Sequence, residues 1–141
     1  PHAIVDNGLR WHVRAFDRKS QSFRDFVLTR VSKVTLKSEP ADNELAEYDS
    51  EWHRMIPLQL VPHPKNVSFP TAIEMDYGME NSQLLINVRA AMAGYLLRRW
   101  NVDCTERGTL EGAEYQLWLQ NLFTLRNVDN LAIAPGYAEP K

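Results

Sequence analysis

Residues 8–30 read "GLRWHVRAFDRKSQSFRDFVLTR", and this stretch decides the fold of the N-terminal part of the chain. Apolar and aromatic residues alternate with polar ones on both sides of the polar segment "DRKSQ", which is typical of two antiparallel strands joined by a turn. Upstream, the apolar residues 3–5 and the turn residues 6–8 predict a further strand that pairs with residues 9–16. We therefore expect three or four consecutive antiparallel strands, as in a small barrel or sandwich.

The same stretch holds five arginines and a histidine, and all but Arg18 lie outside the polar turn segment. Side chains alternate between the two faces of a strand, so Arg10, His12 and Arg14 share one face while Trp11 lies on the other. On the following strand the residues of one parity are Arg24, Phe26, Leu28 and Arg30. If the two strands are neighbours, these cations converge.

Arginine is suited to gripping phosphate, because its planar guanidinium donates paired hydrogen bonds and stays charged at any relevant pH. Trp11 and Phe26 offer aromatic faces on which a base could stack, and His12 adds a hydrogen-bond donor. The alternative is that the arginines lie on a solvated face or pair with Asp17, Asp25 or the acidic segment that follows. The sequence leaves both readings open.

Charge is distributed unevenly along the chain. Residues 1–37 hold eight Lys and Arg against three Asp and Glu, whereas residues 38–141 hold eight against fifteen. The basic third predicts an anionic partner, namely a nucleotide, a nucleic acid or an acidic protein surface. With no membrane-spanning run, no signal peptide and a single Cys104, the expected setting is the cytoplasm, without a disulfide, a thiolate metal site or any cofactor.

Downstream, the acidic residues 38–54 lose the apolar period, which marks a connector with one short helix around 44–49 and the boundary between two domains. Residues 55–64 then predict a strand that its prolines confine to a sheet edge or limit in length. The remaining elements expected are a helix at 68–78, a strand at 83–88, a helix at 89–100 with Val88, Met92, Tyr95 and Leu96 along its apolar stripe, a last strand at 113–123 and a loose tail at 134–141. The fold class is α+β.

No sequence motif for catalysis is present. The chain has no phosphate-binding glycine loop, dinucleotide turn, nucleophile elbow or zinc-binding helix motif. Cys104 lies beside Asp103 and Glu106, whose charges oppose thiolate formation. We therefore expect a protein that is not an enzyme.

"GLRWHVRAF" followed by "FRDFVLTRVSKV" resembles the core of the WYL domain, in which a Trp-Tyr-Leu-like strand precedes an R-x-F-x-L-x-R strand. His12 and Val13 replace the usual Tyr and Leu, a variant similar to that of the WYL repressors of bacterial phage-defence systems. The stretches "LVPHP", "IEMDYGM" and "VRAAMAGYLLRRW" resemble the C-terminal extension of those regulators.

This resemblance implies a WYL domain at residues 1–54, built as an Sm-like, SH3-type small β-barrel and including the acidic connector. An αβ extension at 55–141 would take part in forming a homodimer. The family's winged helix-turn-helix DNA-binding domain and its first barrel strand would precede Pro1, which would leave a strand edge unpaired.

The resemblance also implies a sensor of a nucleotide or single-stranded nucleic acid, which relays binding to the DNA-binding domain. At matching positions it points to Trp11, His12, Arg14, Arg24 and Arg30, to which the stacking argument adds Phe26. The alternative function is a purely structural oligomerisation module whose basic strands touch DNA or a partner subunit without a small ligand.

Overall fold

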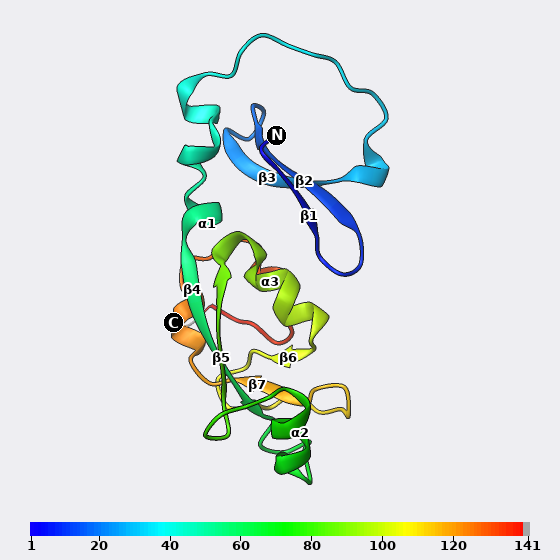
Figure 1. Ribbon diagram of the computed structural model, residues 1–141, viewed down its shortest axis with the longest axis vertical. Coiled ribbons are helices and arrows are strands. Elements are labelled where there is room, and N and C mark those ends of the chain that lie inside the picture. Colours follow the sequence, from blue (N-terminus) through cyan, green and yellow to red (C-terminus); the bar gives the residue numbers. More distant parts are fainter. Residues whose placement is uncertain (140–141) are drawn as a thin grey trace.

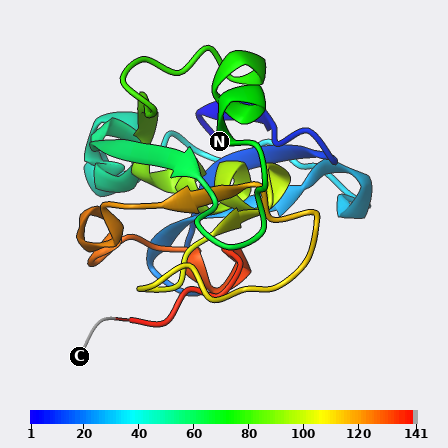
Figure 2. The same cartoon turned by 90° about the horizontal axis from the view of Figure 1, so that it is seen from below.

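The computed structural model describes residues 1–139 and contains two β-sheets joined by the acidic connector (Figure 1). The N-terminal sheet is antiparallel, with strand order β1-β2-β3, and the C-terminal sheet has the order β5-β4-β7-β6. The strands are β1 (Ala3–Asp6), β2 (Trp11–Asp17), β3 (Ser22–Val27), β4 (Met55–Pro62), β5 (Leu84–Arg89), β6 (Val102–Asp103) and β7 (Leu117–Leu119). The α-helices are α1 (Ser50–His53), α2 (Pro70–Asp76) and α3 (Ala90–Arg99). Seen from below, the C-terminal sheet lies in front of the N-terminal one, so the sheets follow each other along the molecule's long axis (Figure 2).

The predicted N-terminal hairpin is confirmed. Its turn is closed by side chains: Asp6 Oδ1 accepts the N–H of Gly8 at 2.8 Å, and Asn7 Oδ1 accepts the N–H groups of Leu9 and Arg10, both at 2.9 Å. Gly8 has a φ of 82°, a left-handed conformation that glycine adopts without strain. The Asp-Asn-Gly turn thus fixes the register of β1 against β2.

The expected barrel is not formed by residues 1–139. After β3 the chain makes a 3₁₀ turn at Leu28–Arg30, and residues 31–41 then run without helix or strand. Three strands are too few to enclose a core, so the sheet stays open and its outer face exposes Ile4 and Phe26. The α+β class is confirmed, but this part of it is an open sheet.

The core of the C-terminal part lies between its sheet and α3. Leu58, Leu60, Leu117 and Leu119 point inward from the sheet and are fully buried. α3 meets them with small residues and one leucine, namely Ala90, Ala91, Ala93, Gly94 and Leu97. Of the stripe predicted for this helix, Val88 and Leu96 pack against the margin of the core, but the fully buried face consists of the small residues, which permit the close packing.

β4 is an inner strand, paired with β5 on one side and with β7 on the other, so the expected edge position was wrong. Pro57 is tolerated because it lies beyond the segment that pairs with β7, where its missing N–H removes no ladder bond. There the carbonyl of Pro57 accepts a hydrogen bond from Asn121 Nδ2 at 3.0 Å, and Asn121 Oδ1 accepts the N–H of Gln59 at 2.8 Å. The Asn121 side chain thus makes the hydrogen bonds to β4 that a neighbouring strand would otherwise make.

The loop after β4 is held by a buried histidine. His63 Nε2 donates to Asp103 Oδ2 at 2.9 Å, and its Nδ1 accepts the N–H groups of Lys65 and Asn66 at 3.2 and 3.1 Å. Both His63 and Asp103 have fully buried side chains. This loop is therefore locked to β6.

Other expectations fared unevenly. The helix at α2 and the strand at β5 are confirmed, the connector contains two 3₁₀ turns before α1, and the last strand is shorter than predicted. The tail was predicted to be loose, yet the Pro135 carbonyl accepts the N–H of Cys104 at 2.9 Å and Ala134 is buried. Residues 140–141 lie outside the described part. Within residues 1–139, no helix is long and apolar enough to cross a membrane.

Candidate ligand-binding site

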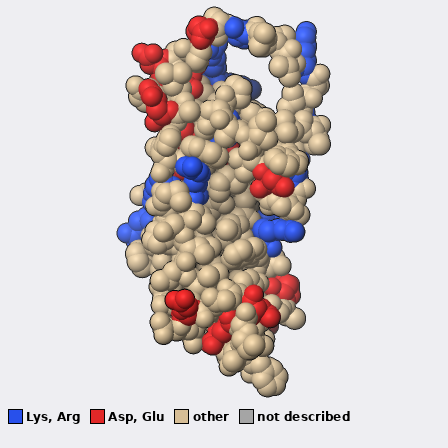
Figure 3. All heavy atoms as spheres, in the orientation of Figure 1, with Lys and Arg blue, Asp and Glu red and all other residues tan. Residues whose placement is uncertain are grey.

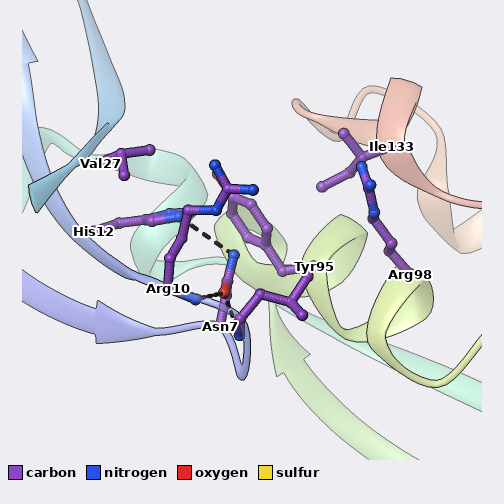
Figure 4. A pocket seen from close by; sticks show the side chains of 8 residues that line it. Asn7, Arg10, His12, Val27, Tyr95, Arg98 and Ile133 are labelled. Carbon is purple, nitrogen blue, oxygen red and sulfur yellow. Dashed lines mark hydrogen bonds between the residues drawn. The ribbon is translucent and has the colours of Figure 1, made fainter. Parts of the chain in front are cut away.

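A cavity of about 220 Å³ lies where the β1–β2 turn and β2 meet α3 and the 3₁₀ turn at Leu131–Ile133 (Figure 4). It thus lies between the N-terminal sheet and the C-terminal part. Its lining combines two guanidinium groups, a histidine, an amide, a phenol and apolar side chains: Asn7, Leu9, Arg10, His12, Val27, Tyr95, Arg98 and Ile133.

His12 is the buried polar group of this cavity, with 4% of its surface exposed. The oxygen of the Asn7 amide is engaged by the turn, so its nitrogen is the donor 3.3 Å from His12 Nε2 (Figure 4). Nε2 therefore accepts, and the neutral ring carries its proton on Nδ1. Within residues 1–139, Nδ1 is a buried polar atom without a hydrogen-bond partner.

Arg10 and Arg98 bring positive charge to the cavity from two different elements. In the part of the chain that the structure describes, neither makes an ion pair with a carboxylate. On the face drawn in Figure 3, cations lie around the middle of the molecule and at its upper end, and acidic residues lie at both ends and also near the middle. The cavity therefore has the chemistry of an anion site with apolar walls, which suits a phosphorylated base.

Arg14 lies in a buried ion-pair network beside the cavity. Its guanidinium donates to both oxygens of Asp49, at 2.6 and 2.9 Å, and to Asp25 Oδ1 at 3.2 Å. Asp25 Oδ2 also accepts from the Tyr95 hydroxyl at 3.0 Å, and Asp49 Oδ2 lies 2.9 Å from His2 Nε2. The network thus connects the N-terminal sheet, the connector and α3.

The ionisation of these groups follows from their neighbours. Burial alone would raise the pKa of Asp49, but the hydrogen bonds from Arg14 and His2 outweigh it and hold that pKa below its usual value. Burial and the nearby Asp25 raise the pKa of Tyr95 well above its ordinary range. Arg14 is therefore neutralised by the protein itself, as the ion-pair alternative anticipated, and has no free charge for a ligand.

Five of the six sequence-predicted site residues lie on the N-terminal sheet, where they divide between its two faces, and Arg30 follows the sheet. His12 and Arg14 point toward the C-terminal part and are buried. In the register of β2 with β3, Val13 lies opposite Phe26 and Ala15 opposite Arg24, so these residues share the other face.

That outer face carries Trp11, which is 53% exposed, together with Phe26. Arg24 lies 3.5 Å from Asp17 in a surface ion pair, and Arg30 is exposed on the 3₁₀ turn after β3. The structure therefore does not bring the six predicted residues into one pocket, and only His12 lines the cavity.

Among the polar lining residues, sequence reasoning missed Asn7, Tyr95 and Arg98. The sequence pattern places Asn7 in a turn and Tyr95 on an apolar stripe, and it gives Arg98 no role beyond a position near the C-terminal end of its helix, where a cation is favourable. The one available signal was a second arginine cluster, Arg98 and Arg99, next to an aromatic residue. The position of this arginine cluster near β2 depends on how α3 packs, and no local sequence pattern encodes that packing.

Residues 55–125, half of the chain, match the family described as "BrxR transcriptional regulator, C-terminal dimerization domain". The chain belongs to the BrxR family of transcriptional regulators. The matched BrxR segment begins with β4 and contains β5, α3 and β7. The membership agrees with the WYL-type repressor expected from the sequence.

The curated relatives carry the name "DNA-binding transcriptional repressor CapW". The protein from Pseudomonas aeruginosa is 38% identical over 104 residues, which cover 73% of this chain and 34% of the relative. The protein from Escherichia coli is 35% identical over 107 residues (75% and 35%), and that from Stenotrophomonas maltophilia 36% over 106 (73% and 34%). This BrxR-family chain thus spans about a third of the length of the curated relatives it matches.

The BrxR and CapW names describe regulators and not enzymes, as expected from the sequence. The chain's single thiol fits this conclusion, because burial raises the pKa of Cys104 to about 12 and keeps it protonated.

Proposed function

We propose that this chain is the ligand-sensing and dimerisation part of a bacterial transcriptional repressor, and that its effector is a nucleotide or a nucleic-acid fragment. The cavity at the junction of β2 and α3 carries the proposal, because it combines a buried histidine with two arginines that have no carboxylate partner among residues 1–139. DNA would be bound by a domain outside these 141 residues, as the name of the CapW relatives supports.

The position of the cavity supports a relay. Arg10 belongs to the N-terminal sheet side, whereas Arg98 lies on α3, within the segment matched to the dimerization domain. An anion held by both side chains favours one arrangement of these two parts over another. Effector binding thereby shifts the population of dimer geometries that the DNA-binding domain experiences.

The domain division belongs to the same proposal. We assign residues 1–54 to the sensing unit and 55–141 to the dimerisation unit. The open N-terminal sheet becomes a small Sm-like barrel when further strand sequence from outside the 141 residues covers it. The exposed apolar side chains of that sheet, Ile4 and Phe26 among them, support this assignment.

Isothermal titration calorimetry with cyclic mononucleotides, linear mononucleotides and short single-stranded oligonucleotides tests the effector site. We expect saturable binding by the wild-type chain and about tenfold or greater weakening in Arg10→Ala and in Arg98→Ala, because each loses a charge-assisted contact to phosphate. Arg107→Ala, an exposed cation outside the cavity, should bind like the wild type. Loss of binding in Arg24→Ala instead would move the site to the outer face.

The ion pairs of Arg14 and Arg24 favour one alternative, a structural module without a small ligand. Flat titrations of a folded protein, combined with binding to duplex DNA that falls steeply with salt, would support it. In that case several Arg→Ala variants would weaken DNA binding uniformly across sequences.

A further inference from the structure

β5 is an edge strand of the C-terminal sheet, alongside β4 in Figure 1. Asn87 lies opposite Pro57, which has no N–H, and Leu85 lies opposite Gln59, whose N–H and C=O bond Asn121 and Gln120 on the other side. These are therefore non-hydrogen-bonded pairs. The backbone groups of Leu85 and Asn87 point away from β4, and in residues 1–139 no other strand pairs with them.

This edge lacks the protection that sheet edges usually carry. β5 reads "LLINVR", without a proline or a lysine to block a further strand. Its one charged residue is turned elsewhere: Arg89 donates to the Trp52 carbonyl at 2.6 Å, and its guanidinium lies 4.6 Å from the centre of the Trp52 ring. The edge is thus open to main-chain pairing.

The face next to this edge is partly apolar, and its one charged residue is Arg89 at the end of β5, opposite Met55. Leu85 is 63% exposed on β5 and Met55 is 52% exposed on β4. Between them, Pro57, Gln59 and Asn87 complete the outward surface of the two strands. Apart from Arg89 at its end, this strip beside the free edge consists of uncharged residues with exposed apolar side chains, which is the composition of an interface core.

We infer that β5 of one copy pairs antiparallel with β5 of a second copy about a two-fold axis. The two four-stranded sheets then join into one eight-stranded sheet, with Leu85 and Asn87 at the seam. An antiparallel strand edge is self-complementary, as a two-fold interface requires. The inference rests on the proposed dimerisation and names the surface that performs it.

The matched segment favours this surface over its rivals. Residues 55–125, described as a dimerization domain, include all of β4 and β5. The exposed apolar face of the N-terminal sheet, represented by Ile4 at 66% exposure, lies outside that segment. Met75 on α2 is 78% exposed, but a short helix offers no unpaired backbone edge.

Light scattering coupled to size-exclusion chromatography tests the inference on the 141-residue chain. We expect a dimeric wild type and monomers for Leu85→Lys, which places two like charges at the seam, and for Asn87→Pro, which removes an outward N–H. The matched controls Met75→Lys and Ile4→Lys remove equally exposed apolar side chains elsewhere and should stay dimeric. Circular dichroism should show that all four variants are folded.

The outcomes separate the inference from the function it rests on. A monomeric wild type would contradict dimerisation by this chain altogether. A dimeric wild type with a dimeric, folded Leu85→Lys would overturn only the β5 interface, and a monomeric Ile4→Lys or Met75→Lys would assign the interface to that other face. In the expected dimer, Asn87→Cys should form an intersubunit disulfide under mild oxidation, whereas Thr71→Cys on α2 should not.

Discussion

Arg14 is the residue whose role depends most on residues distant in the sequence. Strand periodicity places it correctly beside His12, but the carboxylate that pairs with it comes from Asp49, 35 positions later. A buried guanidinium is stable only with such partners, because unpaired charge in the interior is costly. An arginine that the sequence offers as a phosphate ligand is thus a structural ion pair.

Asp49→Asn tests this ion pair. We expect the free energy of unfolding at pH 7 to fall by about 3–5 kcal/mol, because the change leaves the buried Arg14 without its main counter-charge. Urea unfolding followed by circular dichroism measures it, and Asp42→Asn, on the exposed part of the connector, should change stability by less than about 0.5 kcal/mol.

The difference in unfolding free energy between the wild type and Asp49→Asn should depend on pH. The folded-state pKa of Asp49 lies below its ordinary value of 3.8, so the contribution of the ionised carboxylate is complete above that pH. It is lost as the pH falls through the depressed folded-state pKa. The stability difference between wild type and Asp49→Asn should therefore shrink as the pH falls from about 5 to about 2, which is roughly the interval over which a carboxylate with a lowered pKa takes up its proton. A constant difference would contradict the ion pair.

Gly94 is a second residue with a role set by contact. A Cβ at this position would lie 2.5 Å from the Asn130 carbonyl oxygen. Gly→Ala inside a helix ordinarily stabilises by about 1 kcal/mol. Here we expect Gly94→Ala to destabilise by about 1–3 kcal/mol, as overpacking does. Thermal unfolding gives the sign, and a stabilised variant would show that the segment around Asn130 shifts freely.

At the scale of elements, local sequence pattern predicts that a strand or helix exists better than it predicts where that element lies in the fold. Turn chemistry at residues 6–8 and the period of residues 9–27 predict the N-terminal strands correctly. The sequence does not reveal that Asn121 substitutes for a strand beside Pro57, which is why β4 can be central. The buried side of α3 was also missed, because a helix with several alanines and a glycine packs through its smallest residues, which carry little hydrophobic signal.

The loop between β4 and the segment containing α2 depends on one side chain. His63→Ala should lower the free energy of unfolding by about 2–4 kcal/mol, because Asp103 and two backbone N–H groups lose their buried partner. His53→Ala, whose ring is exposed, should cost no more than about 1 kcal/mol. Chemical denaturation of both variants measures these losses of unfolding free energy. Equal losses would show that the hydrogen bonds of His63 contribute nothing to stability.

At the scale of the whole molecule, half of the candidate site is predictable. The cations of the first thirty residues indicate an anionic ligand, and His12 does line the cavity. The other wall comes from Tyr95 and Arg98, more than eighty positions away, and their approach depends on how α3 packs beneath the N-terminal sheet. Alternation along β3 also ends at Val27, so Arg30 has no place in a predicted strand face.

The exposed segment at residues 31–41 forms no strand or helix, so the two parts of the protein that it links could assemble without it. The contacts of His2 and Arg14 with Asp49 connect its two sides without it. A site-specific protease sequence inserted between Lys33 and Lys37 should therefore yield two fragments that still elute together at pH 7 and separate in the Asp49→Asn background. The cleaved protein then consists of two separate fragments, and the strength of their association measures how well the N-terminal sheet packs against the rest of the chain.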